Sequence, residues 1–169
     1  MKDLPWVIEA RKHIGLKEIP GPKHNPIILQ WLKNLKAWWS DDETPWCGVF
    51  VGEMLRITDR YVPALYMRAL EWNNAGLKLS KPAYGCLVTF SRSGGGHVGF
   101  CVGEDQQGRL MILGGNQSNA VSIAPFDKAR VVGYIWPATK DGQQLGPLPG
   151  RYELPLYNAN GIASSKNEA

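Results

Sequence analysis

The stretch Asp42-Glu43-Thr44-Pro45-Trp46-Cys47-Gly48-Val49-Phe50-Val51 predicts the start of a helix and places a cysteine in its first turn. Thr44 is a residue type that caps helices, and Pro45 suits the first helical position. Apolar residues then recur with helical spacing at Phe50, Val51, Met54 and Leu55. Free N–H groups and the dipole at a helix N-terminus stabilise a thiolate, which makes Cys47 a candidate nucleophile. The alternative is that Cys47 is a small buried core residue.

The composition is that of one globular domain. The chain has 169 residues, of which 44% are hydrophobic and 20% charged, so it is long enough to bury a sizeable core. No apolar run approaches the ~18 residues of a membrane-spanning helix, so we expect no stable membrane insertion. The first residues lead directly into charged positions, which is not the pattern of a secretory signal. We therefore expect synthesis in the cytoplasm without a signal peptide.

The cysteines and the net charge exclude several classes of protein. The three cysteines, Cys47, Cys86 and Cys101, contain no C-x-x-C pair, which excludes a zinc ribbon or a thioredoxin-type motif. Cys86 and Cys101 lie in apolar segments and are expected to be packing residues. The net charge of +4 favours polyanionic partners, namely nucleic acid, anionic lipid or a cell-wall polymer, without choosing among them. Lys and Arg are dispersed along the chain, so nucleic acid is the least favoured partner.

The order of elements predicts an α+β fold. Helical spacing indicates helices over residues 4–14, 26–38, 45 to about 57, and 65–75. Beyond Gly76, short β-branched and aromatic runs predict an antiparallel meander with strands at 86–90, 97–102, 110–113, 121–124 and 131–136. Helices followed by strands are typical of α+β domains. We assign residues 1–137 to a single domain and 138–169 to an extended tail, with disorder expected over 164–169.

His97 is the histidine placed to act as a base for Cys47. His13 and His24 lie in a charged helix and a proline-rich loop, where surface roles are expected. His97 opens a predicted strand directly after three glycines, which leave room for a substrate chain. Strand alternation turns His97 away from the core face formed by Val98, Phe100 and Val102. The alternative is a histidine at a strand end with no role in chemistry.

Asn116 is the candidate to orient His97. It follows the predicted return strand of a hairpin, whose end lies beside the start of the outgoing strand. An amide oxygen there can accept the imidazole N–H and fix its tautomer, as in Cys-His-Asn proteases. Asn116 can instead be a turn residue, because Gly-Gly-Asn is also a turn sequence. Gln117 and Asn119 are weaker candidates, for substrate contact or a tight turn.

Three motifs in this order resemble the papain-like CHAP domains and their NlpC-type relatives, which are cysteine peptidoglycan hydrolases. The motifs are Trp46-Cys47-Gly48-x-Phe50-Val51, His97-Val98-Gly99-Phe100 and Gly114-Gly115-Asn116-Gln117. The opening Gly15-x-x-Glu18-Ile19-Pro20-Gly21 with His24-Asn25-Pro26-x-Ile28 is similar to a subgroup found in bacteriophages and prophages. The resemblance covers roughly residues 4–136, and it implies a papain-like fold.

The resemblance implies an endolysin-like hydrolase that cuts an amide bond of the bacterial cell wall, as an N-acetylmuramoyl-L-alanine amidase or an endopeptidase. Cys47 would attack the carbonyl, His97 would move the proton and Asn116 would hold His97, while Trp46 and Gln117 would contact substrate. The implied partner is peptidoglycan, bound by a monomer that needs no cofactor and is made in the host bacterial cytoplasm to act in the periplasm. A wall-binding module with a vestigial triad, or a Cys-His acyltransferase, are the alternatives.

Two parts of the family pattern are missing from the sequence. Papain relatives supply an oxyanion donor from a Gln shortly before the cysteine, but residues 39–43 contain none, so only the Cys47 N–H is assigned. Some CHAP domains bind calcium through alternating acidic residues at this point. Here Asp41, Asp42 and Glu43 are consecutive, and a calcium ion needs about six oxygen ligands. A favourable charge at the helix N-terminus is the simpler reading, and no metal is predicted.

Overall fold

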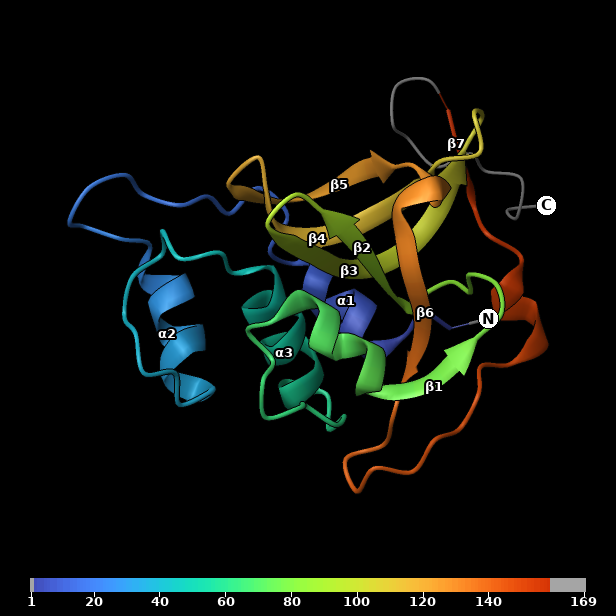
Figure 1. Cartoon of the computed structure of the whole chain (residues 1–169), viewed down its shortest axis with the longest axis horizontal. Helices are drawn as coiled ribbons and strands as arrows, with labels where there is room; N and C mark the ends of the chain where they lie inside the picture. Colours follow the sequence, from blue (N-terminus) through green and yellow to red (C-terminus); the bar gives the residue numbers. More distant parts are fainter. Residues whose placement is uncertain (1, 159–169) are drawn as a thin grey trace.

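The computed structural model describes residues 2–158 and has an α+β fold, as the sequence predicts (Figure 1). The helices are α1 (Pro5–Arg11), α2 (Pro26–Asn34) and α3 (Cys47–Ile57), with 3-10 helices η1 (Ala69–Asn74), η2 (Lys128–Arg130) and η3 (Pro149–Tyr152). The strands are β1 (Gly76–Leu79), β2 (Leu87–Arg92), β3 (Gly95–Asp105), β4 (Leu110–Gln117), β5 (Ala120–Phe126), β6 (Val131–Pro137) and β7 (Leu156–Tyr157). The five predicted strands correspond to β2 to β6.

Over the described residues the strands form one seven-stranded sheet with the order β1-β6-β2-β3-β4-β5. Neighbours on this path are antiparallel, while β7 pairs with β3 in parallel. β2 pairs with β3 on one side and with β6 on the other, and its register sets Phe90 opposite His97. The β4–β5 pairing shifts between Gly114 and Gln117, so a bulge or irregularity lies at the point where the candidate site begins.

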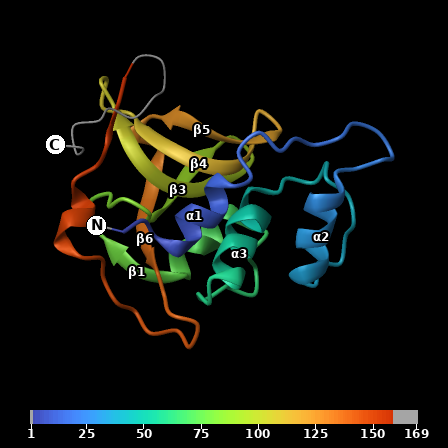
Figure 2. The same cartoon turned by 180° about the vertical axis from the view of Figure 1, so that it is seen from behind.

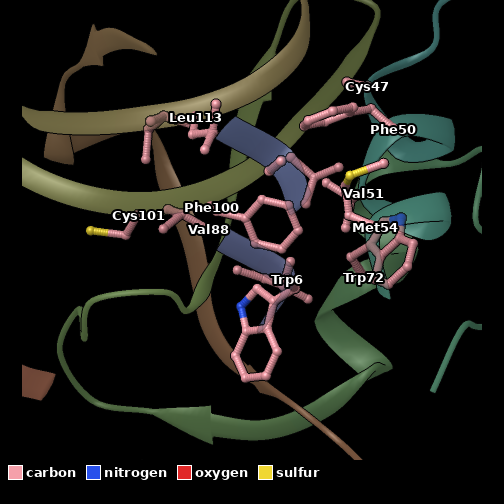
Figure 3. Packing of buried hydrophobic residues seen from close by; sticks show 14 of the residues in the cluster. Trp6, Cys47, Phe50, Val51, Met54, Trp72, Val88, Phe100, Cys101 and Leu113 are labelled. Carbon is pink, nitrogen blue, oxygen red and sulfur yellow. The ribbon is translucent and has the colours of Figure 1, made fainter. Parts of the chain in front are cut away.

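The helices α1 and α3 lie against the sheet, and α2 lies beyond α3 on the side away from the sheet (Figures 1 and 2). The first nine residues of α3 are all buried. Figure 3 shows Phe50 and Met54 of α3 facing Phe100 of β3. Trp6 of α1 belongs to the same cluster of buried side chains. Burial of each large side chain of this kind contributes about 1.5–3 kcal/mol, which fixes α3 on the sheet.

Two predicted helices differ in the structure. α3 begins at Cys47 rather than at Pro45, its N-cap is Trp46, and no side chain caps it, so the predicted Thr44 cap is wrong. Thr44 instead donates its backbone N–H to Asp41, 2.7 Å away, in a turn that precedes the helix. The segment 65–75 forms only the short helix η1, since residues 62–68 run as turns and irregular chain.

The chain after β6 is more ordered than an extended tail. η3 and β7 lie in this part, and β7 pairs with Glu104 and Asp105 at the end of β3. Tyr157 is 3% exposed and packs on Gly103, where a side chain would meet its ring. The predicted disorder over 164–169 lies outside the described residues. Among the helices of residues 2–158, none is long and apolar enough to cross a membrane.

Candidate active site

Cys47 is the first residue of α3 and its side chain is almost completely buried, with 6% of its surface exposed. Burial raises the pKa of this thiol, and the backbone N–H groups of Val98, Gly48 and Cys47 itself act in the opposite direction. The sequence expectation that the helix N-terminus would favour the thiolate is therefore outweighed by desolvation. In the free protein Cys47 is a neutral thiol at neutral pH.

Gln117 holds His97, at the start of β3, from the end of β4. His97 Nε2 lies 2.9 Å from Gln117 Oε1. The Gln117 side-chain nitrogen donates to the carbonyl oxygens of Ile112 and Ser122, at 3.1 and 2.9 Å, so the amide oxygen must face the ring. An oxygen can only accept, which puts the imidazole proton on Nε2 and leaves Nδ1 as the basic nitrogen. Within the described part of the chain Nδ1 is buried without a hydrogen-bond partner.

Asn116 does not orient His97, so that prediction is wrong. Its backbone adopts a φ of 56° inside β4, where the pairing with β5 is irregular, while Ser118 and Asn119, which are also left-handed, form the tight turn into β5. The turn alternative for Asn116 is not met either, because the turn begins one residue after Gln117, at Ser118. Gln117, predicted as a substrate contact, is 7% exposed and occupies the orienting position instead.

Aromatic rings enclose the His97 imidazole, which is 1% exposed. The ring of Phe126 lies parallel to it with centroids 5.1 Å apart, and Phe90 lies 6.3 Å away. Burial lowers the pKa of His97 to about 4; the Gln117 bond opposes this shift, and the charges of Arg92 and Arg130 add to it. The imidazole is therefore neutral above about pH 5 and is available as a proton acceptor.

Helix α3 packs on β3 and β4, which brings Cys47 close to the start of the strand that carries His97. The Val98 N–H that faces the Cys47 thiol belongs to the residue next to His97. The charge of Arg92 acts on both Cys47 and His97. In residues 2–158 no hydrogen bond joins Sγ to the ring. Both groups are neutral at neutral pH because burial raises the pKa of the thiol and lowers the pKa of the imidazole. The arrangement can pass a proton from sulfur to Nδ1 when a reacting carbonyl enters, because apo sites often tighten only in the complex.

Two adjacent glycines of β4 separate the helix layer from the His97 pair. A Cβ on Gly114 would lie 2.4 Å from Gln117 Oε1 and 3.4 Å from His97 Nε2. A Cβ on Gly115 would lie 2.7 Å from Phe50 Cβ and from the Trp46 ring. Backbone alone therefore fits between α3 and the imidazole, which is the physical reason for Gly-Gly at this point.

Trp46 is a buried support rather than an exposed surface for substrate. It is 1% exposed, and its indole N–H donates to Glu18 Oε1 at 2.7 Å. The Glu18 backbone N–H in turn donates to the Asn119 carbonyl, 3.0 Å away. Glu18 thus connects the residue before the nucleophile with the turn that follows Gln117. The sequence reasoning missed this role, although Glu18 stands in a motif that it singled out.

Asp42 holds the loop before α2 in place. The sequence instead predicted that its charge would interact with the N-terminal dipole of α3. Its side chain is completely buried and accepts the backbone N–H groups of Ile19 and Asn25 at 2.8 and 2.6 Å. His24 Nδ1 lies 3.0 Å from the second oxygen. In the described residues, His24, Asp42 and Glu43 are the one trio with ligand atoms within 4.8 Å of one another. The oxygens of Asp42 already accept three hydrogen bonds, so they fit a loop anchor better than a metal ligand.

The other two cysteines are fully buried, as expected for packing residues. Cys101 points to the opposite side of β3 from Phe100 (Figure 3). Strand alternation places it on the same side as His97, four residues earlier.

No protein-family model matches the chain, and no curated protein was found to be similar to it in sequence.

Proposed function

We propose that the protein is a papain-like cysteine hydrolase that cuts an amide bond of peptidoglycan. The observation that supports this most strongly is the pairing at the site. A buried cysteine at a helix N-terminus faces the backbone of Val98, and the preceding residue is a histidine whose Nε2 is held by an amide oxygen and whose Nδ1 has no partner among the described residues. A nucleophile, a base and an orienting amide are the parts that cysteine acyl transfer needs.

The neutral state of both groups sets the order of proton transfer. Cys47 Sγ attacks the amide carbonyl while its proton moves to His97 Nδ1, giving a tetrahedral intermediate and an imidazolium. The imidazolium then protonates the leaving amine as the C–N bond breaks, which leaves a thioester on Cys47. A water molecule, deprotonated by Nδ1, attacks the thioester, and the carboxylic acid leaves as the proton returns to sulfur. The Cys47 N–H is one donor for the oxyanion.

In the proposed mechanism the polar residues around Cys47 and His97 hold these two residues in position. Gln117 keeps the proton of the neutral ring on Nε2, so that Nδ1 is the basic nitrogen in every turnover. Trp46 and Glu18 fix the chain immediately before Cys47, which determines where the nucleophile sits. A displacement of about 1 Å at such a site can cost about 100-fold in rate, so these supports matter although they touch no substrate.

The substrate class comes from the resemblance of the Cys47, His97 and Gly114–Gln117 motifs to CHAP and NlpC-type enzymes. In this proposal the protein is an endolysin-like enzyme of a phage or prophage. It is made in the bacterial cytoplasm and acts on the wall in the periplasm as a monomer, without a cofactor. It cleaves either the muramoyl–L-alanine bond or a peptide bond of the stem or cross-bridge.

The test is digestion of purified Gram-negative peptidoglycan by the wild type, by Cys47→Ala and by the matched control Cys86→Ala, with products resolved by mass spectrometry. We expect Cys47→Ala to lose at least about 1,000-fold in rate, because removal of the nucleophile leaves only binding and oxyanion effects. Cys86→Ala removes a buried core thiol and should retain activity. Free stem peptides identify an amidase, and shortened peptides still attached to glycan identify an endopeptidase.

Equal digestion by wild type and Cys47→Ala would refute the mechanism. Binding of the sacculus by both proteins without digestion by either would favour the wall-binding module. Release of product only when an added amine acts as acceptor would favour the acyltransferase.

A further inference from the structure

Two arginines stand at the end of the sheet where β3, the strand that carries His97, begins. Arg92 ends β2 at the turn into β3, and Arg130 ends η2 just before β6. Both residues are exposed. β2 pairs with β6 here, and two hydrogen bonds join Ser91 to Arg130: the Ser91 hydroxyl donates to the Arg130 carbonyl, and Arg130 Nε donates to the Ser91 carbonyl. Arg130, just before β6, is therefore held against the residue that precedes Arg92, at the end of β2.

An aromatic stack connects Arg130 to the imidazole. The Arg130 guanidinium carbon lies 5.9 Å from the centroid of the Phe126 ring, within the range of a cation–π contact. Phe126 stacks on His97 with an interplanar angle of 6°. Only one ring thus separates the cation from the proposed base.

Neither arginine has an anionic partner in the described part of the chain. Within residues 2–158, ion pairs involve other cations, such as Arg56 with Glu53, Arg109 with Asp105 and Lys128 with Glu104. Arg92 and Arg130 take part in none of them. Their charges also oppose protonation of His97, which is unfavourable for a residue that must accept a proton. Two unpaired cations at this place point to an anionic group on the ligand.

We propose that Arg92 and Arg130 form a carboxylate-binding subsite that selects stem peptides with a free carboxylate close to the scissile amide. This inference rests on the proposed function. Arginine is suited to the task because its planar guanidinium presents parallel donors that match the two oxygens of a carboxylate. The bound carboxylate also offsets both positive charges, so His97 accepts the Cys47 proton more readily. Recognition then raises the catalytic rate as well as the affinity.

The test compares two synthetic stem peptides that differ only in this carboxylate, which is free in one and a primary amide in the other. Binding to Cys47→Ala is measured by calorimetry, so that no turnover interferes. We expect the free carboxylate to bind about 10- to 100-fold more tightly, the range of a charge-assisted hydrogen bond. In Cys47→Ala/Arg92→Gln and in Cys47→Ala/Arg130→Gln this preference should fall by at least about threefold.

The matched control is Cys47→Ala/Lys128→Gln, which removes one positive charge from the same 3-10 helix as Arg130. Lys128 pairs with Glu104 and should not affect the preference. Circular dichroism melting checks that each variant is folded. If the Arg130→Gln variant does not fold, the Arg92→Gln variant, changed at an exposed position, is sufficient for the test. Equal binding of the two peptides, weak binding of both, or a preference that survives the arginine substitutions would each overturn the subsite.

Cleavage assays with the same peptides separate the subsite from the proposed function. A wild type that cleaves both peptides equally is a hydrolase without the subsite. A wild type that binds the free carboxylate through Arg92 and Arg130 but cleaves neither peptide keeps the subsite and loses the function. Preferential cleavage of the free-carboxylate peptide, lost in Arg92→Gln, supports both.

Discussion

The structure contains two histidines that bond to an acidic or amide side chain at almost the same distance, yet their surroundings differ. His24 lies 3.0 Å from a carboxylate oxygen of Asp42, and His97 lies 2.9 Å from the amide oxygen of Gln117. The His24 side chain is 23% exposed, whereas His97 is 1% exposed between aromatic rings. One histidine thus has an anionic partner near water, and the other has a neutral partner in the interior.

In the proposed mechanism this difference separates a structural histidine from the one that acts as the base. Asp42 contacts the His24 ring and also accepts two backbone N–H groups, so the whole cluster holds a loop in place. Gln117 orients the His97 ring but adds no negative charge. Burial then keeps the ring neutral, with a pKa of about 4, and Nδ1 remains free to take a proton. The identity of the partner therefore decides which histidine can act as a base.

The largest expected effect that separates the two clusters comes from removing each ring in turn. We predict that His97→Gln lowers kcat/KM on peptidoglycan fragments by at least about 1,000-fold, because the proton acceptor for Cys47 is lost. His24→Gln should leave kcat/KM within about threefold, since His24 lies in the loop cluster. Steady-state kinetics with both variants at pH 7 measures this. A larger loss in His24→Gln than in His97→Gln would invert the assignment.

A second substitution gives His97 the kind of partner that His24 has. Gln117→Glu puts an anion beside the ring and should raise the pKa of His97 from about 4 toward its ordinary value near 6.5. A raised pKa keeps the ring protonated to higher pH, so the acid limb of kcat/KM should move from near pH 4 to near pH 6. Activity at pH 5 then falls about 10- to 30-fold relative to wild type. NMR titration of the ring gives the pKa directly.

The control is Gln117→Met, which is similar in size but carries no charge and cannot fix the tautomer. It should lower kcat at all pH values without moving the acid limb toward higher pH. An acid limb that stays near pH 4 in Gln117→Glu would show that Gln117 does not contact the ring that titrates.

The smallest expected effect on activity is in the loop cluster, where the change should appear as stability. Asp42→Ala removes an acceptor for Ile19, Asn25 and His24 and should lower the free energy of unfolding by about 2–3 kcal/mol. Glu43→Gln, at the exposed neighbour, should change it by less than about 0.5 kcal/mol. Urea denaturation measures both. If Asp42→Ala were as stable as wild type but lost activity, the cluster would belong to the site.

The fold could be predicted from sequence where the period of apolar residues and the order of segments along the chain indicate the same element. Alternating apolar residues predict β2 to β6, and the predicted helix start near Cys47 and strand start near His97 are both found within two residues. β1 and β7 were missed because each is short, with four and two residues, and is defined by pairing with distant chain. The burial of Trp46 and the Glu18 contact depend on a loop 28 residues away, which no local pattern encodes.

The choice between Asn116 and Gln117 could not be made from strand alternation. The β4–β5 register shifts between Gly114 and Gln117, and such an irregularity re-aims the side chains that follow it. Regular pairing predicts Asn116 beside His97, whereas the shifted register places Gln117 there. The signal that was available is chemical: three left-handed residues, Asn116, Ser118 and Asn119, are all types that tolerate a tight turn, and Gln117 between them is not such a type.

The paired glycines of β4 have a consequence for how the chain can vary. A single methyl group at Gly114 or Gly115 would collide with Gln117 or with the Trp46 ring and force the layers apart. Surface loops can change length without altering the site, but the gap that these glycines leave has no tolerance for even the smallest addition. Substitutions should therefore not accumulate at these two positions during evolution. In a saturation library of β4, the active clones should all carry glycine there.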